Sequence, residues 1–315
     1  MLEPAPPPAL TYPNAAALRA QLNARDTASH WRSLMVLVGS MIVFGALQGT
    51  SFEPKGAAVL IAVLMFHELG HALGMKLFGY RDVRIFFIPL LGAATQGQAQ
   101  GASAAKRGII LLLGPMPGLL LAFVLALVLR PVKHSLEWNL VATLSGLNAL
   151  NLLPVEPFDG GRLVNLVLSA RFRVLDLASV VLGAVGMGAL SVASGSWALA
   201  IPAFLMLLSV GSRWRAFKAA RELSQRFPNL PERIEDASDE VLEALHGAAR
   251  EVGRVAYLKG DQAQAKATAS WARQLYERAQ TRHPDLVTSI ALMIAHGSGF
   301  FTALATIVAL AILQR

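Results

Sequence analysis

Cysteine is absent from the 315-residue chain, and charged residues are scarce. Without cysteine the chain has no disulfide scaffold, no thiolate metal site and no cysteine nucleophile, so any metal ion must be bound by His, Asp or Glu. Charged residues make up 15% of the chain and hydrophobic residues 54%, whereas about 25% of an ordinary soluble domain is charged. This composition indicates a membrane protein.

Seven segments are predicted to cross the bilayer. A bilayer core about 30 Å thick needs about 20 apolar residues in each spanning helix. The chain is therefore predicted to be an all-α polytopic membrane protein. The predicted spans are residues 33–50, 56–79, 107–129, 138–155, 175–194, 196–212 and 286–313.

The segments outside these spans are of two kinds. The N-terminal residues, with prolines at Pro6, Pro7 and Pro8, predict a loosely ordered arm rather than a cleavable signal peptide. Residues 213–285 have apolar side chains at helical spacing, which predicts amphipathic helices. We thus expect an arm at 1–32, a six-span membrane domain at 33–212, a helical region at 213–285 and a C-terminal transmembrane helix at 286–315.

Basic residues give the chain a net charge of +8 at pH 7. Beside apolar spans such residues set topology or contact anionic lipid, so the expected partner is the lipid bilayer and no nucleic acid. Eleven Lys and Arg residues lie in the short segments on the N-terminal side of the bilayer, against four on the other side. The N-terminus and residues 213–285 are therefore predicted to be cytoplasmic. A composition rich in Ala, Leu and Arg favours a bacterial cytoplasmic membrane.

The second predicted span contains the sequence His67-Glu68-Leu69-Gly70-His71. A charge at membrane depth costs roughly 2.5 to 3.5 kcal/mol, so these polar residues need partners or a function. His67 and His71 lie one turn apart on one helix face, which suits two ligands of a single zinc ion. Glu68 is rotated off that face and can reach a water molecule beside the metal. The alternative is a structural pair of histidines bonded to backbone carbonyls, with Glu68 protonated.

A catalytic zinc ion needs a third protein ligand. The best candidate segment is 151–161, at the cytoplasmic end of the fourth predicted span, where Pro154 and Pro157 interrupt the helix. Irregular backbone at membrane depth is tolerated where it is buried in protein or lines a cavity. Asp159 is the first choice of ligand and Glu156 the second, while the alternative role of Asp159 is that of a helix cap.

The two segments together resemble the site-2 protease family of intramembrane zinc metalloproteases. Its members carry HExxH on one membrane helix and N-x-x-P-x-P-x-L-D-G on another. In this chain Glu156 stands where the second proline is usual and Phe158 where leucine is usual. Gly114-Pro115 also fits the family, although a kink for helix packing is an equal interpretation. The resemblance covers residues 56–165, the expected protease core.

The resemblance also assigns roles to individual residues. The implied ligands of one zinc ion per chain are His67, His71 and Asp159. Glu68 is implied to be the general base, and Asn151 and Pro154 are implied to lie near bound substrate.

Residues 83–97 are β-prone, and Pro89 restricts them to an edge strand or a hairpin. A transmembrane substrate must unwind before cleavage, and an edge strand can bond the amides that unwinding exposes. The segment is therefore a candidate substrate platform. The backbone amides of Ile85 and Phe87 are the predicted substrate contacts.

We therefore expect an intramembrane zinc metalloprotease. Its reaction is hydrolysis of peptide bonds in or near the transmembrane segments of a membrane-protein substrate, expected to be single-span, as in regulated intramembrane proteolysis. The alternative is a non-proteolytic zinc-binding membrane protein, such as a transporter or a membrane chaperone. A transporter usually has inverted repeats and paired broken helices, and the sequence gives no sign of either.

One histidine lies outside these motifs. His296 is near the middle of the seventh predicted span and is followed by Gly297-Ser298-Gly299. It either gates the entry of substrate or bonds a neighbouring carbonyl group, and the second role is the more usual one for a lone intramembrane histidine.

Overall fold

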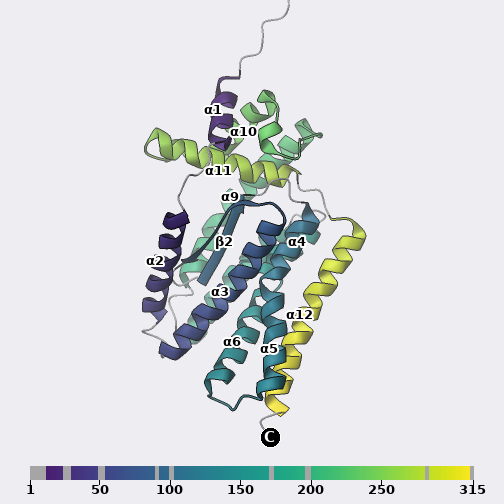
Figure 1. Ribbon diagram of the computed structural model, residues 1–315. Coiled ribbons are helices and arrows are strands. Elements are labelled where there is room, and N and C mark those ends of the chain that lie inside the picture. Colours follow the sequence, from purple (N-terminus) through teal and green to yellow (C-terminus); the bar gives the residue numbers. More distant parts are fainter. Residues whose placement is uncertain are drawn as a thin grey trace, which may run out of the picture. The chain divides into compact units, whose positions relative to one another are not determined.

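The structure is a computed structural model that describes residues 12–23, 30–48, 54–88, 92–98, 103–169, 174–195, 200–280 and 284–312. Its elements, many of which are labelled in Figure 1, fall into two compact units. The larger unit consists of Thr27–Val210 and Arg282–Arg315, and the smaller of Met1–Asp26 and Gly211–Thr281. Helix α9 (Ala200–Arg226) contributes to both.

The larger unit is a helical bundle with a small β-hairpin. At its centre α3 (Pro54–Leu77) packs against α4 (Ala104–Leu113), α5 (Pro115–Leu129) and α6 (Leu136–Asn151). The apolar side chains Val63, Ala122 and Val141 pack together between α3, α5 and α6. The unit also contains α2 (His30–Gln48), α7 (Asp159–Val164), the π-helical turn η1 (Asn165–Ser169), α8 (Val174–Ser194) and α12 (Leu286–Ile312).

Local sequence sets the ends of the central helices. Ser103 caps α4 and Ser135 caps α6, because each hydroxyl accepts a hydrogen bond from a first-turn amide. Pro115 occupies the first position of α5, where its missing N–H costs nothing. Helix α6 ends at Asn151, three residues before Pro154, and the chain is irregular up to α7.

Four helical segments among the described residues are long and apolar enough to cross a membrane. A fifth apolar segment, Leu34–Val43 in α2, is shorter. The expected count of seven spans is thus not confirmed, because α6 has only 16 residues and the apolar start of α9 soon reaches Arg213. The four segments are Pro54–Leu77, Ala104–Leu129, Leu175–Ala193 and Leu286–Ile312.

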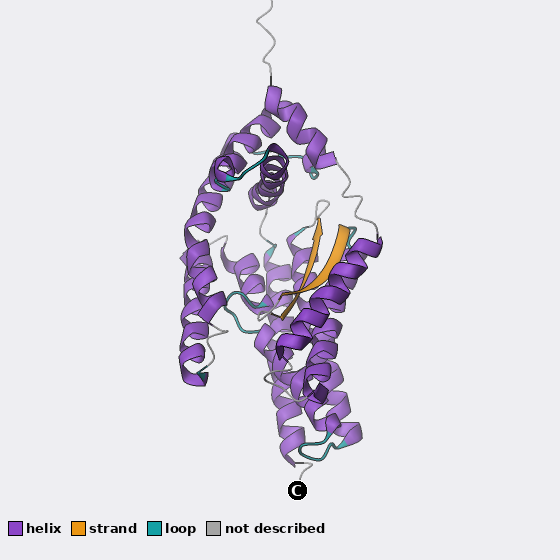
Figure 2. Cartoon of the chain, turned by 90° about the vertical axis from the view of Figure 1, so that its left-hand side faces the viewer, coloured by secondary structure: helices purple, strands orange, loops and turns teal. Residues whose placement is uncertain are grey.

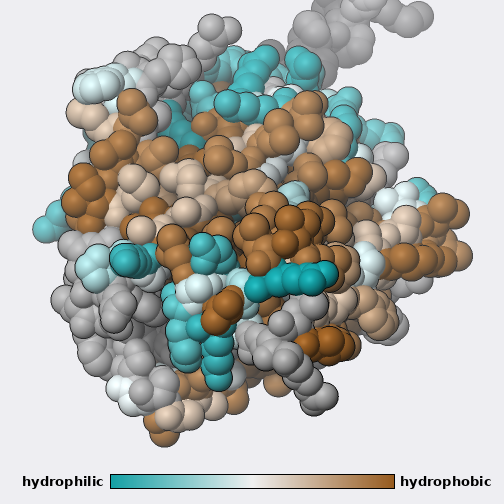
Figure 3. Space-filling model, turned by 60° about the horizontal axis from the view of Figure 1, so that its bottom comes forward, coloured by the Kyte–Doolittle hydropathy of each residue, from teal (hydrophilic) through white to brown (hydrophobic). Residues whose placement is uncertain are grey.

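Hydrophobic side chains cover much of the molecular face shown in Figure 3. Exposed apolar residues occur on several of the candidate spans, for example Val128 on α5, Val192 on α8 and Phe301 on α12, each more than 70% exposed. Such residues would be unfavourable in water, whereas lipid chains solvate them. The surface agrees with an integral membrane protein.

Strands β1 (Arg81–Ile88) and β2 (Gly92–Gln98) form an antiparallel hairpin, drawn in orange in Figure 2. The expected hairpin is thereby confirmed, although Pro89 lies outside the described residues. Strand β1 contacts α2, and β2 contacts α3. The hairpin therefore lies directly beside the helix that carries the HELGH sequence.

The smaller unit has its own apolar core. It is built from α1 (Pro13–Asn23), the C-terminal part of α9, the short 3-10 turns η3 (Ile234–Asp236) and η4 (Val255–Tyr257), α10 (Asp239–Val252) and α11 (Asp261–Gln280). Leu242, Leu245 and Leu275 are at most 1% exposed there. The amphipathic pattern of 213–285 thus corresponds to helices that bury one face against each other.

Helix α1 was not expected within the N-terminal arm. Its buried side chains Ala15, Leu18 and Leu22 pack into the core of the smaller unit, and Arg19 donates to the carbonyl oxygens of Glu235 and Ala237. Only three buried residues mark this short helix, too few for a clear sequence pattern. The first eleven residues, with Pro6, Pro7 and Pro8, lie outside the described residues.

Candidate metal centre

Three side chains converge inside the larger unit. His67 and His71 lie one turn apart on α3, and Asp159 is the first residue of α7. Their atoms His67 Nε2, His71 Nε2 and Asp159 Oδ2 are all 3.1 Å from one another. The three residues are 3%, 7% and 6% exposed. Among the described residues they are the one group of three or more side chains placed to hold a metal ion.

The arrangement fits a zinc ion. In a tetrahedral site with ligand bonds of about 2.0 to 2.1 Å, neighbouring ligand atoms are about 3.3 Å apart, close to the spacing of 3.1 Å found here. Two imidazoles and one carboxylate also form a usual zinc donor set. His67, His71 and Asp159 are therefore positioned as three ligands of one metal ion.

Hydrogen bonds to the far side of each imidazole fix which nitrogen faces the metal centre. His71 Nδ1 donates to the carbonyl oxygen of Ile110 at 2.8 Å, because a carbonyl oxygen can only accept. His67 Nδ1 lies 2.8 Å from Asn148 Oδ1, and Asn148 Nδ2 donates to Leu144 O at 2.7 Å. Asn148 Oδ1 is thus the acceptor, and both Nε2 lone pairs face Asp159. Three such acceptors at 3.1 Å repel one another unless a metal ion or a proton lies between them.

The irregular segment before α7 positions Asp159. A Cβ atom on Gly160 would lie 2.1 Å from Leu152 O, and one on Gly161 would lie 2.2 Å from the carbonyl carbon of Val155. Only glycine lets the first turn of α7 fold back this closely on the chain that precedes it. The carboxylate of Asp159 is thereby brought to α3.

Gly114 lies between α4 and α5 and backs the metal centre. A Cβ atom at this position would lie 2.3 Å from His71 Nε2 and 3.0 Å from His67 Nε2. Any side chain would therefore occupy the space that the metal ion needs. The Gly114-Pro115 pair thus leaves space at the metal centre and also separates α4 from α5.

Glu68 lies beside the three ligands and outside their set. Its side chain is 6% exposed, and its Oε2 accepts a hydrogen bond of 2.6 Å from Thr95 Oγ1 on β2. The carboxylate is thus buried next to the centre and held by the hairpin.

Of the predicted substrate contacts, none is a member of the metal cluster. Asn151 is half-buried and donates through Nδ2 to Leu147 O, while Pro154 is exposed. Ile85 and Phe87 lie on β1, opposite Thr95 and Ala93 of β2. The amide of Phe87 donates to Ser40 Oγ at 3.0 Å, so this predicted contact already has a partner within the chain.

Two other candidates have structural roles. Glu156, the second choice of ligand, is buried, and its Oε1 accepts from Asn165 Nδ2 at 3.1 Å. His296 Nε2 lies 2.7 Å from Leu152 O, which supports the interpretation that this histidine bonds a neighbouring carbonyl. It links α12 to the segment that carries Asp159.

Sequence reasoning missed Asn148 and Thr95. Asn148 is fully buried on α6, one turn before Asn151. A polar asparagine inside a predicted span is costly without a partner, and this cost could have identified it. Thr95 gave no signal, because threonine is common in strands.

Comparison with known proteins finds similarity to zinc metalloproteases. Residues 55–145, which include α3 with its HELGH sequence, match the model of peptidase family M50. This match supports a relationship to the site-2 protease family. It is 29% identical over 151 residues to zinc metalloprotease MJ0392 of Methanocaldococcus jannaschii, covering 45% of this chain and 41% of that protein. It is 31% identical over 130 residues to stage IV sporulation protein FB of Bacillus subtilis, covering 40% and 45%.

The chain spans less than half the length of those two relatives. Zinc is the cofactor that the family and the cluster of His67, His71 and Asp159 both indicate. The family match ends at residue 145, before Asn148 and Asp159. The assignment of Asp159 to the centre therefore depends on its position 3.1 Å from both histidines.

Replacing Asn148 with Leu is expected to weaken zinc binding by about 10- to 100-fold, because the variant keeps a similar volume and loses the acceptor that orients His67. Titration of the purified protein with a zinc-competing chelator measures this affinity. Asn139→Leu, at the other end of α6, is the matched control and should bind zinc as the native protein does. Native affinity in Asn148→Leu would show that His67 needs no such support.

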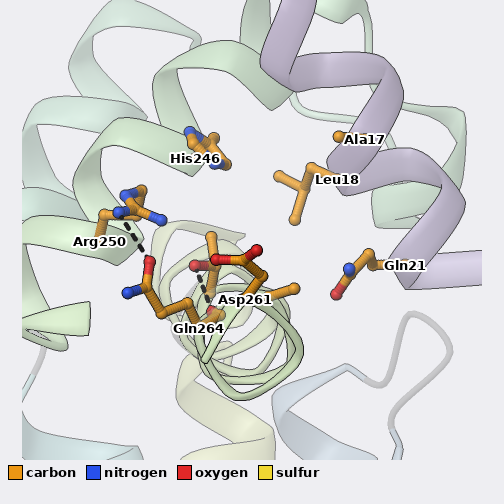
Figure 4. Close-up of a pocket in the computed structure, with 9 residues that line it drawn as sticks. Ala17, Leu18, Gln21, His246, Arg250, Asp261 and Gln264 are labelled. Carbon is orange, nitrogen blue, oxygen red and sulfur yellow. Dashed lines mark hydrogen bonds between the residues drawn. The ribbon is translucent and has the colours of Figure 1, made fainter. Parts of the chain in front are cut away.

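A separate cavity of about 200 Å³ lies in the smaller unit between α1, α10 and α11 (Figure 4). Its polar groups bond one another, since Arg250 donates to Gln264 Oε1 and Gln264 donates to Leu258 O. Burial, and to a lesser degree the charge of Arg250, lower the pKa of His246, so this imidazole is neutral at pH 7. The cavity contains none of the predicted catalytic residues.

Proposed function

We propose that this chain is an intramembrane zinc endopeptidase that hydrolyses peptide bonds in or near the transmembrane segments of membrane proteins. The observation that carries the proposal is the buried cluster of His67, His71 and Asp159 with Glu68 beside it. The cluster lies among helices with apolar exposed surfaces. A scissile bond that reaches it must therefore come from a segment that enters this bundle.

One edge of the hairpin is the proposed docking site for the substrate. An unwound transmembrane segment has free amide groups that are costly in hydrocarbon, and a sheet edge can bond them. Because β1 contacts α2 and the Phe87 amide donates to Ser40 Oγ, we assign the docking edge to β2, which contacts α3. Asn151 and Pro154 remain candidates for contacts further along the substrate.

Each catalytic residue has a proposed task. When bound, zinc supplies Lewis acidity that polarises the scissile carbonyl and makes water a stronger nucleophile. Glu68 takes a proton from the attacking water and returns it to the leaving amine, so that the amide bond is replaced by a carboxylic acid and an amine. Asn148 and Ile110 hold the two imidazoles in the orientation that zinc binding requires.

The proposal extends to the location and the substrate. The excess of Lys and Arg on one side of the predicted spans supports a cytoplasmic N-terminus. We propose a bacterial cytoplasmic membrane, a single-span substrate and a role in regulated intramembrane proteolysis. The relatives, a zinc metalloprotease of Methanocaldococcus jannaschii and a stage IV sporulation protein of Bacillus subtilis, are compatible with this role in a prokaryote.

Comparison of membranes that contain the native protein with membranes that contain Glu68→Gln should identify single-span proteins that accumulate uncut in the variant. One such protein, reconstituted in liposomes with the native enzyme, should give two peptide products by mass spectrometry. A zinc chelator should stop their formation and added zinc should restore it. Zinc flux into the liposomes without any peptide product would instead favour a transporter. The absence of both peptide product and zinc flux would favour a chaperone.

A further inference from the structure

Strand β2 contacts the proposed general base through one side chain. We infer that Thr95 is a positioning residue that links the docking of substrate on β2 to the orientation of Glu68. The inference rests on the proposed function, because it assigns a task within that reaction. Two independent features of Thr95 support it, the hydrogen bond of its side chain and the direction of its backbone.

The hydroxyl of Thr95 holds the carboxylate of Glu68. Thr95 Oγ1 lies 2.6 Å from Glu68 Oε2 and 3.1 Å from Glu68 O. A hydroxyl has one proton, and the shorter distance is that of a charge-assisted bond to a carboxylate. In the part of the chain that the structure describes, no other hydrogen bond to this carboxylate is found. Threonine is β-branched and stiff about its Cα–Cβ bond, so its hydroxyl direction is well defined.

The backbone of Thr95 faces the docking edge. In an antiparallel pair, opposed residues alternate between those that bond each other and those whose N–H and C=O groups point outward. The Phe87 amide points away from β2 because it donates to Ser40 Oγ, so the pair Phe87 and Ala93 is of the outward kind. Two residues along, the pair Ile85 and Thr95 is of the same kind. The N–H and C=O of Thr95 therefore point away from β1.

A substrate strand added to this edge would pair with Thr95 itself. Neighbouring strands are about 4.8 Å apart, and the Glu68 carboxylate is one hydrogen bond from the Thr95 hydroxyl. The residue that bonds the substrate backbone thus also holds the base. Substrate that docks on β2 would meet a carboxylate that Thr95 already holds in place, which lowers the entropic cost of the reaction.

The test compares Thr95→Val, which keeps the shape and loses the donor, with Thr95→Ser, which keeps the donor. The purified full-length protein is reconstituted with the single-span substrate, and kcat, KM and zinc per chain are measured. In Thr95→Val we expect kcat to fall by about 10- to 100-fold, with zinc content unchanged and KM changed much less. Thr95→Ser should recover most of kcat. Thr302→Val, the same change on α12 away from the site, should leave kcat as in the native protein.

Several results would overturn the inference. A native kcat in Thr95→Val would show that Glu68 needs no support from β2. Loss of zinc or of folding in Thr95→Val, or a kcat in Thr95→Ser as low as in Thr95→Val, would show that Thr95 supports the local structure and does not act through Glu68. Absence of cleavage by the native, zinc-loaded protein would instead contradict the proposed function, and the two failures are therefore distinguishable.

Discussion

Replacing Glu68 with Gln is expected to abolish peptide-bond cleavage while the protein keeps about one zinc ion per chain. Gln has nearly the same shape as Glu but cannot take a proton from water. It also leaves His67, His71 and Asp159 unchanged as ligands. The expected loss is at least about 100-fold in rate, the lower range for general acid–base catalysis.

Two measurements on one preparation check this expectation. Product formation from the reconstituted single-span substrate gives the rate, and elemental analysis gives the zinc content. Cleavage by Glu68→Gln at close to the native rate would refute the mechanism, in which Glu68 is the general base. The native protein, treated identically, is the control.

Replacing Asp159 with Ala is expected to lower zinc content from about one ion per chain to near zero. The variant loses one of three protein ligands and leaves two imidazoles, which is fewer than zinc sites in proteins normally provide. His71→Ala should give the same result for the same reason. Activity should be lost together with the metal, in contrast to Glu68→Gln.

Glu156→Gln is the matched control for Asp159→Ala, since both residues are buried acids of the same segment. The Glu156 carboxylate accepts from Asn165 Nδ2, and Gln retains an oxygen that can do the same. Zinc content should therefore stay at the native level. The reverse outcome, zinc retained in Asp159→Ala and lost in Glu156→Gln, would make Glu156 the third ligand.

Much of the metal centre could be predicted because short sequence patterns identify its residues. The i, i+4 spacing places His67 and His71 on one face of any helix, and the structure has α3 as a helix throughout this range. The prolines and glycines around Asp159 predicted a broken segment, and α6 does end at Asn151. The hairpin followed from β-prone residues beside Pro89.

The remainder depends on which elements become neighbours. The hydrogen bond from His67 to Asn148 joins residues 81 positions apart, and the bond from Thr95 to Glu68 joins residues 27 apart. Neither spacing follows from a helix or strand period. The amide of Phe87 was expected to be free for the substrate, yet its partner Ser40 is on α2, 47 residues away. Such contacts are decided by packing, which a single sequence does not reveal.

The sequence pattern also could not determine the number of membrane spans. Apolar windows measure composition, and the predicted span 138–155 runs four residues past Asn151, where α6 ends. In the structure α6 stops at 16 residues, too short to count by length alone. Whether α2, α6 and the start of α9 cross the bilayer stays a prediction, and six spans before residue 213 remain the expected number.

The packing of α1 in the smaller unit indicates whether the number of membrane crossings is odd or even. Asn14 Nδ2 donates to Glu243 Oε1 at 2.7 Å, and Ala15, Leu18 and Leu22 share a core with α10 and α11. Residues on both sides of the segment 27–210 therefore lie in one compartment, so the chain between them crosses the membrane an even number of times. Three of the four long apolar segments fall within 27–210, and three is odd. With all three of these segments as crossings, we expect at least one further crossing within 27–210, made by a helix that length and composition do not identify.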